Sequence, residues 1–181
     1  MIPSYVDLTP ARQRYKQACI NLGLTVDLRL ISFLVSKTDR TLSILQNGQT
    51  VMQIPVIIGR DPVGHKQTEG DLKTPEGNYR ICYFNPDSRF HLFLGLNYPN
   101  ANDAQQAWQG RRLSTEEYEA LLRADHTGMC PNWYTTLGGE VGIHGGGIER
   151  EGTAGCIAMA NTDIELVWSV ALYGTTVGIR R

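Results

Sequence analysis

Apolar positions near the start of the chain recur with the period of a helix. They fall three or four residues apart and so share one helix face: Ala11, Tyr15, Cys19 and Leu22. Thr9-Pro10 supplies an N-cap residue and a first-turn proline, and Gly23 can end the helix. The pattern predicts a short amphipathic helix over residues 10–22, docked on the remainder of the protein.

After this helix the apolar pattern changes to that of strands. Runs rich in β-branched and apolar residues occupy 26–35, 42–45 and 50–58. Asn47-Gly48 separates the second run from the third, and this dipeptide favours a type I′ turn because both of its residues tolerate positive φ. The pattern predicts a meander of three strands.

The second half of the chain mixes strands, loops and helices. Strands are expected at 78–84, 92–97, 141–144 and 175–179, and loops at 59–74 and 98–113. Two capping-box patterns, at Ser114–Glu117 and Thr162–Glu165, predict helices, the second running to about Leu172. Six or seven strands and three short helices indicate a mainly β (α+β) domain.

Length and charge limit the classes of function. The chain has 181 residues, which suits one domain over 25–181 with an N-terminal helical extension over 1–24. Lys and Arg number 17 and Asp and Glu number 18, a net charge of −1 that argues against nucleic acid as a partner. No apolar run reaches the roughly 18 residues of a transmembrane segment.

The N-terminus and the cysteines leave the compartment open. Residues 1–24 lack the apolar core of a signal peptide, so the protein is either cytoplasmic or has lost a leader. The four cysteines form no C-x-x-C motif: Cys19, Cys82, Cys130 and Cys156. An even number permits disulfides, but the sequence does not choose the pairs.

Some segments partly match three familiar motifs but lack residues that those motifs require. Gly59-x₄-Gly64 lacks the Lys-Ser/Thr that a P-loop needs next, since His65-Lys66 follow. His144–Gly147 resembles an esterase oxyanion loop, but no G-x-S-x-G elbow follows it. The histidine and cysteine spacings match no zinc site. We therefore expect no cofactor and no metal.

The strongest chemical pattern joins His144 to Thr153-Ala154-Gly155-Cys156. A thiol attacks as the thiolate, and an imidazole can remove its proton. Gly155 lets a substrate carbonyl approach the backbone, where amides can hold a developing oxyanion. The alternative is a small buried Cys among apolar neighbours and an ordinary polar His at a strand end.

These residues resemble a known family. Ile143-His144-Gly145 followed by Thr153–Met159 is similar to the signature of YkuD-type L,D-transpeptidase catalytic domains. The segment Gly70–Ile81 resembles the family's G-D-x-x-T-P-x-G-x-Y/F-x-I block, and Val35–Leu42 with the following hairpin resembles the start of the domain. The resemblance covers roughly residues 26–181.

The resemblance implies a mixed, sandwich-like β fold and acyl transfer on peptidoglycan stem peptides, in the periplasm or at the cell wall. Cys156 would attack the carbonyl of the third stem residue, usually meso-diaminopimelate, and expel the terminal D-amino acid. An amine acceptor would then resolve the thioester. His144 would be the base, the Gly145 carbonyl would orient its ring, and amides near Gly155 and Cys156 would form the oxyanion hole.

Two departures from the family pattern keep other functions open. Ala154 and Ala158 replace the usual His and the usual Arg or Asn beside the nucleophile. An L,D-carboxypeptidase or amidase would use the same Cys156 and His144 with water as acceptor. A non-catalytic wall-binding module would bury Cys156.

Substrate contacts are predicted for residues beside Cys156, on the loop over 59–74 and at the start of the strand over 92–97. They comprise Thr153 and Gly155 beside the nucleophile, His65, Lys66 and Asp71 on the long loop, and His91 at a strand start. Trp133-Tyr134 precede the strand that carries His144 and could shape the substrate groove.

Overall fold

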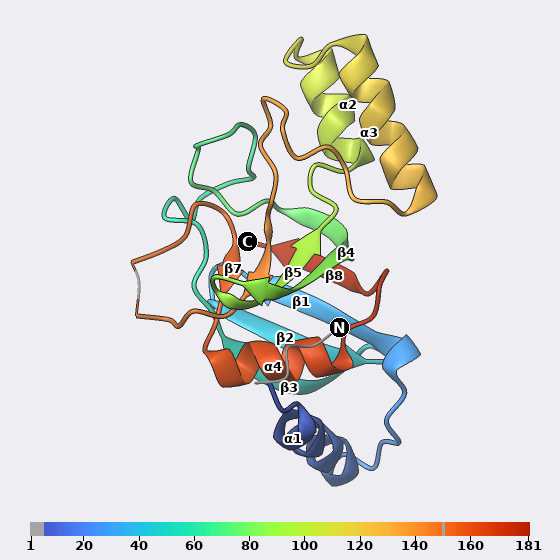
Figure 1. Cartoon of the computed structure of the whole chain (residues 1–181), viewed down its shortest axis with the longest axis vertical. Helices are drawn as coiled ribbons and strands as arrows, with labels where there is room; N and C mark the ends of the chain where they lie inside the picture. The colour runs from blue at the N-terminus through green and yellow to red at the C-terminus, as the bar shows by residue number, and fades with distance from the viewer. Residues whose placement is uncertain (1–5, 150) are drawn as a thin grey trace.

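The structure is a computed structural model that describes residues 6–149 and 151–181. In these residues the strands are β1 Ile31–Ser36, β2 Thr41–Gln46, β3 Gln49–Pro55, β4 Gly77–Ser88, β5 His91–Leu96, β6 Gly142–His144, β7 Ile157–Ala158 and β8 Thr176–Arg180. They form one mixed sheet in the order β3-β2-β1-β8-β4-β5-β6-β7 (Figure 1). The helices are α1 Thr9–Asn21, α2 Ala101–Gln109, α3 Thr115–Thr127 and α4 Asn161–Val170.

The N-terminal meander is confirmed in its essentials. β1 and β2 pair antiparallel, as do β2 and β3, and Asn47 and Gly48 take φ values of 51° and 77° in the turn. The first strand begins later than predicted, because Leu28–Leu30 form a short 3₁₀ helix capped by the side chain of Asp27.

β4 joins the two halves of the sheet. Its first residues pair with β8, which runs parallel to β1, and its remainder pairs with β5. β6 follows β5, and β7 lies parallel to β6. The sequence did not predict β7, which is only two residues long, yet this strand directly follows Cys156.

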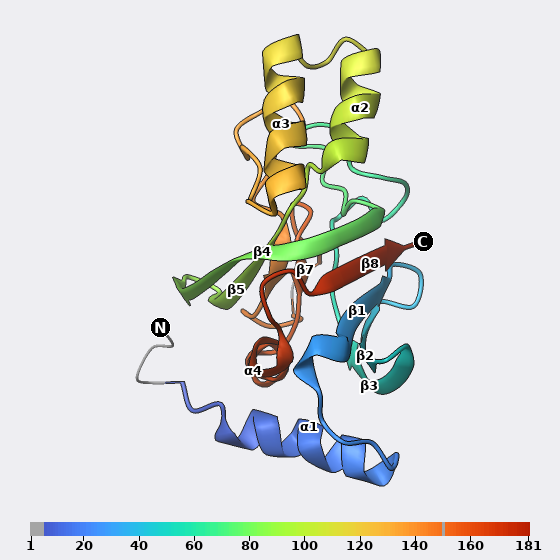
Figure 2. The same cartoon turned by 90° about the vertical axis from the view of Figure 1, so that its right-hand side faces the viewer.

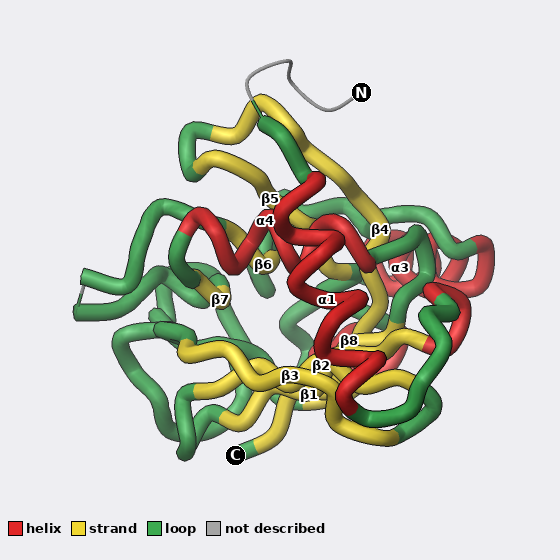
Figure 3. Tube along the Cα trace, turned by 90° about the horizontal axis from the view of Figure 1, so that it is seen from below, coloured by secondary structure: helices red, strands yellow, loops and turns green. Residues whose placement is uncertain are grey.

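Two helices pack together on one side of the sheet. Figure 2 shows the sheet bending around α4, and Figure 3 shows α1 lying beside α4, in agreement with their contacts. The expected cap positions are wrong here: α1 has Leu8 at its N-cap and α4 has Ala160, neither with a capping side chain. α4 therefore starts before the Thr162 box, and it ends at Val170, short of Leu172.

The remaining helices form a hairpin that stands away from the sheet (Figures 1 and 2). The expectation of a loop over 98–113 is wrong, because α2 occupies its middle. Asn100 and Asp103 form a reciprocal capping box at the start of α2. The predicted box of α3 is confirmed, with both hydrogen bonds between Ser114 and Glu117 present.

A disulfide and a separate small core hold this hairpin. Cys82 on β4 is bonded to Cys130, which follows α3. Five buried residues form the core between the helices: Ala104, Ala107, Leu113, Leu121 and Leu137. The α+β class is thus confirmed, with one more helix than the sequence indicated. Within the described residues no helix combines the length and the apolar character needed to span a membrane.

Candidate active site

Two short parallel strands bring Cys156 and His144 to the same face of the sheet. Ile143 pairs with Ile157 and His144 with Ala158, so Cys156 lies beside Gly142. Side chains alternate along a strand, which puts His144 and Cys156 on one face. Strand spacing and rise place their Cα atoms roughly 8 Å apart, so the two side chains can meet.

The turn before Cys156 is fixed by Thr153. Its Oγ1 donates to the Cys156 carbonyl at 2.6 Å and accepts from the Gly155 N–H at 3.0 Å. Its backbone bonds Ile58 and Arg60 on the neighbouring segment. Gly155 has φ +142°, and a Cβ there would lie 2.8 Å from the Lys73 carbonyl oxygen. The close approach requires glycine at this position.

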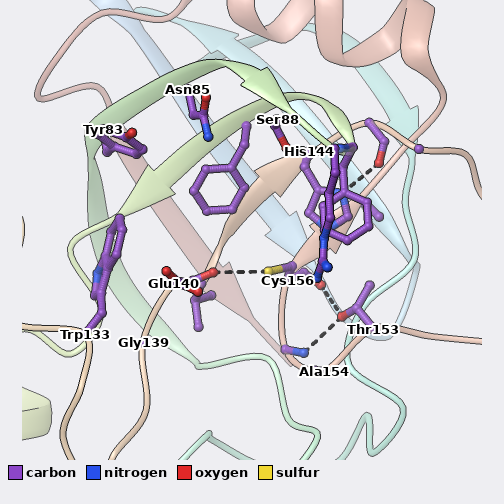
Figure 4. A pocket seen from close by; sticks show the side chains of 18 of the residues that line it. Tyr83, Asn85, Ser88, Trp133, Gly139, Glu140, His144, Thr153, Ala154 and Cys156 are labelled. Atoms are coloured by element: carbon purple, nitrogen blue, oxygen red, sulfur yellow. Dashed lines mark hydrogen bonds between the residues drawn. The ribbon is translucent and has the colours of Figure 1, made fainter.

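The Cys156 thiol lies in a confined polar environment. The residue is half-buried, and its Sγ donates to the Glu140 carbonyl at 3.4 Å (Figure 4). Burial raises the pKa of the Cys156 thiol to about 11, although the Gly142 N–H and the Lys66 ammonium lower it. The thiol is therefore protonated at neutral pH, and an attack on a carbonyl requires a base to take its proton.

His144 is held in one orientation. The residue is 5% exposed, and its Nδ1 lies 2.6 Å from the Gly145 carbonyl oxygen. Because a carbonyl only accepts, Nδ1 carries the proton and Nε2 keeps its lone pair in the neutral ring. Phe90 stacks on this ring at 4.5 Å, and Phe93 on the paired strand lies at 6.4 Å. In this tautomer Nε2 is the ring nitrogen that can accept a proton.

Both residues line one open pocket of about 1150 Å³. Figure 4 shows Cys156 with Glu140 to one side and His144 to the other, while Trp133 and Tyr83 form a more distant wall. Tyr134 also lines the pocket, and its hydroxyl reaches Glu140 at 3.3 Å. This volume slightly exceeds the range of about 300–1,000 Å³ that is typical of small-molecule sites.

Of the predicted substrate residues on the long loop and the strand start, only Lys66 lines the pocket. His65 accepts from the Glu76 N–H through Nδ1 and pairs with Asp103 through Nε2. Asp103 lies on a different element, α2, so no local sequence pattern predicts its pairing with His65. We assign His65 a structural role.

Asp71 and His91 likewise lie outside the pocket lining. Asp71 accepts hydrogen bonds from the Gln67, Thr68 and Lys73 amides and organises the loop. Burial opposes ionisation of Asp71, but these amides and the Lys66 ammonium hold the pKa of its carboxyl below the usual value. His91 pairs with Glu165 of α4 at 2.7 Å and ties the start of β5 to that helix.

Some residues of the site were not found from the sequence. Glu140 contacts the Cys156 thiol through its carbonyl, and Phe90 and Phe93 stack on His144, yet none of them belongs to a recognisable motif. The Cys156 N–H donates no hydrogen bond to any residue in the described ranges, whereas the Gly155 N–H is taken by Thr153. Of these two amides, only that of Cys156 keeps its N–H for a bound group. The described residues contain no cluster of three or more potential metal ligands.

Comparison with known proteins agrees with this geometry. The profile of the L,D-transpeptidase catalytic domain family, YkuD, matches residues 31–179. The chain belongs to this family. Among curated proteins it is 28% identical over 119 residues to the protein named "Putative L,D-transpeptidase YafK" of Escherichia coli (strain K12). That alignment covers 62% of this chain and 46% of YafK.

Solved structures show the same fold. The helical cell shape determining protein Pgp2 from Campylobacter jejuni has a TM-score of 0.58 and 25% identity, over 84% of this chain and 48% of Pgp2. Bd1075 from Bdellovibrio bacteriovorus has a TM-score of 0.56 and 24% identity, over 83% of this chain and 48% of Bd1075. The family member described here therefore spans about half the length of these relatives.

Proposed function

We propose that this protein catalyses acyl transfer on peptidoglycan stem peptides, with Cys156 as nucleophile and His144 as general base. The observation that carries the proposal is the placement of both residues on one face of paired strands, in one pocket, with the His144 ring oriented by Gly145. Family membership supplies the substrate class, because the family acts on peptidoglycan peptides.

The reaction follows from the geometry in two stages. As Sγ bonds to the carbonyl carbon of the third stem residue, His144 Nε2 takes the thiol proton. The Cys156 amide donates to the oxyanion, and collapse of the intermediate breaks the amide bond while His144 returns the proton to the leaving D-amino acid. An acceptor amine, or water in hydrolysis, then attacks the thioester carbon while His144 takes its proton. The C–S bond breaks, and His144 passes the proton to the sulfur, which restores the Cys156 thiol.

The test uses purified muropeptides and mass spectrometry of the products. His144→Ala should lower turnover by at least ~100-fold, the size of a general-base contribution, with an unchanged melting temperature. His126→Ala is the matched control, because His126 is an exposed residue of α3 outside the pocket. A folded His144→Ala protein with a nearly wild-type rate would contradict the proposal.

Hydrolysis is the second candidate, and the residues beside the nucleophile favour it. Ala154 is exposed and lines the pocket, and Ala158 lines it beside His144, so two polar anchors of the main family pattern are absent. An amine must be held in an attack geometry to compete with water at about 55 M. We expect hydrolysed product alongside cross-linked product, and exclusively cross-linked product at scarce acceptor would exclude this candidate.

The wall-binding alternative requires a buried Cys156, whereas this residue is half-buried and lines the pocket.

The disulfide supports the proposed location in the periplasm or at the cell wall. Disulfides such as Cys82–Cys130 persist in oxidising compartments and are rare in reducing ones. Fractionation of the native organism tests this part of the proposal.

A further inference from the structure

Lys66 is a buried lysine among the residues that line the pocket. The residue is 2% exposed, and it lines the pocket that contains Cys156. Burial of an ammonium group is costly unless it is paired and hydrogen-bonded. A lysine in this position therefore calls for an explanation from its surroundings.

The Lys66 ammonium is held by two groups of its own loop. It donates to the Thr68 carbonyl at 2.9 Å and to Asp71 Oδ1 at 3.0 Å. Asp71 also accepts three backbone N–H groups, so its carboxylate cannot move without breaking the loop. The carboxylate thus fixes the position of the lysine charge.

The side chain of Lys66 lies against the turn that carries the nucleophile. A Cβ built on Gly155 would be 3.8 Å from Lys66 Cδ, so the aliphatic stem packs on the residue before Cys156. The Lys66 carbonyl accepts from the buried hydroxyl of Tyr98 at 3.3 Å, which anchors the backbone at the same point. Both ends of the residue are fixed next to the nucleophile turn.

We propose that Lys66, held by Asp71, is a positioning residue that places a fixed positive charge beside Cys156 and stabilises its thiolate. This rests on the proposed function for Cys156 as nucleophile. The assignment replaces the substrate contact expected for Lys66, because its hydrogen bonds go to its own loop.

Charged and titratable groups of other elements also face Cys156. Those that line the pocket with it are Arg60, Glu69, Tyr83, Asp87, Arg89, Tyr134, Glu140 and His144. Two of the charges act on the thiol pKa in opposite directions: Lys66 lowers the pKa of Cys156, and Glu140 raises it. Lys66 is thus the cation that offsets part of the effect of burial.

The test is the pH dependence of Cys156 alkylation by iodoacetamide, mapped by peptide mass spectrometry. Lys66→Met should raise the alkylation midpoint by about one pH unit, because an adjacent opposite charge lowers a pKa by about 1 to 3 units. At a fixed pH below the midpoint the rate should fall about tenfold. Lys66→Arg should restore most of it.

Lys73→Met is the matched control. Lys73 belongs to the same loop, but its ammonium pairs with Asp61 at 3.4 Å and does not line the pocket. Its removal should leave the alkylation midpoint unchanged. An unchanged midpoint in folded Lys66→Met, with only a higher KM for peptide, would assign Lys66 to substrate binding and overturn the proposal.

Lys66→Gln decides the matter if Lys66→Met does not fold. Glutamine keeps a hydrogen-bond donor for the Thr68 carbonyl and Asp71 but removes the positive charge, so the alkylation midpoint should rise. An unchanged or lower midpoint would overturn the proposal. The alkylation readout needs no peptidoglycan, so a protein inactive on muropeptides could still pass it, and the two failures remain distinguishable.

Discussion

Removal of the Cys82–Cys130 disulfide should cost stability much more than it costs the chemistry of the pocket. The bond joins β4 to the segment after α3 and closes a loop with a sequence separation of 48. That loop contains β5 and the α2–α3 hairpin. The double variant Cys82→Ser/Cys130→Ser opens it without adding bulk.

The size of the effect follows from the loop length. Chain-entropy arguments give about 4 kcal/mol at 25 °C for a loop of this length. For a chain of this size, 1 kcal/mol moves the melting temperature by about 2 to 4 °C, so a fall of roughly 8 to 16 °C is expected. The pocket wall should hold, because Trp133 also packs edge-on against Tyr83 at 5.9 Å. Alkylation of Cys156 at 25 °C should change by less than about twofold.

Differential scanning calorimetry and timed alkylation measure the two effects. Wild type treated with a phosphine reductant is the control, because its melting temperature should equal that of the double variant. The reductant should leave the melting temperature of the double variant unchanged. A fall below about 2 °C would refute the loop argument. A large loss of Cys156 reactivity in the folded double variant would show that the disulfide, rather than aromatic packing, holds the pocket wall.

Three further outcomes are expected. Native alkylation should modify Cys156 alone, with Cys19 reacting only in denaturant because it is fully buried; prior labelling of Cys19 would contradict the packing. Gly155→Ala should cost about 1 to 3 kcal/mol of stability and slow alkylation, whereas Gly147→Ala, with open space around its Cβ, should leave alkylation unchanged; equal rates would count against the clash. The pKa of Asp71 is depressed in the folded protein, so its stabilisation is present above pH ~4 and is lost in acid. Urea titrations should show the advantage of wild type over Asp71→Asn shrinking from pH 5 to pH 2.

Local signals in the sequence predicted those elements whose stability is itself local. The hairpin at Asn47-Gly48 and the capping box of α3 depend on residues a few positions apart. α2 was missed because its exposed residues are mostly polar and its buried residues are two small alanines and an aspartate, Asp103. The Asn100-x-x-Asp103 pattern could have indicated the start of α2, because it forms a capping box with residues other than Ser and Glu.

The features that the sequence did not predict depend on residues that are far apart in the chain. β7 exists because Ile143 and Ile57 flank it, and neither is near it in the chain. The same holds for His65, whose partner Asp103 lies on α2. The turn residues from Thr153 to Cys156 were predicted because their motif is compact. The disulfide partners and the aromatic rings around His144 required the fold.

The packing of α1 shows that the hydrophobic core extends beyond the segment that matches the family. The family match begins at residue 31, yet the main core contains five earlier buried residues: Val6, Leu8, Ala11, Tyr15 and Cys19. Tyr15 also donates to the buried Gln46 of β2 at 3.3 Å. A fragment trimmed to the family boundary would keep every residue of the proposed chemistry while exposing α4 to water. A fragment that keeps this packing should therefore begin before Val6.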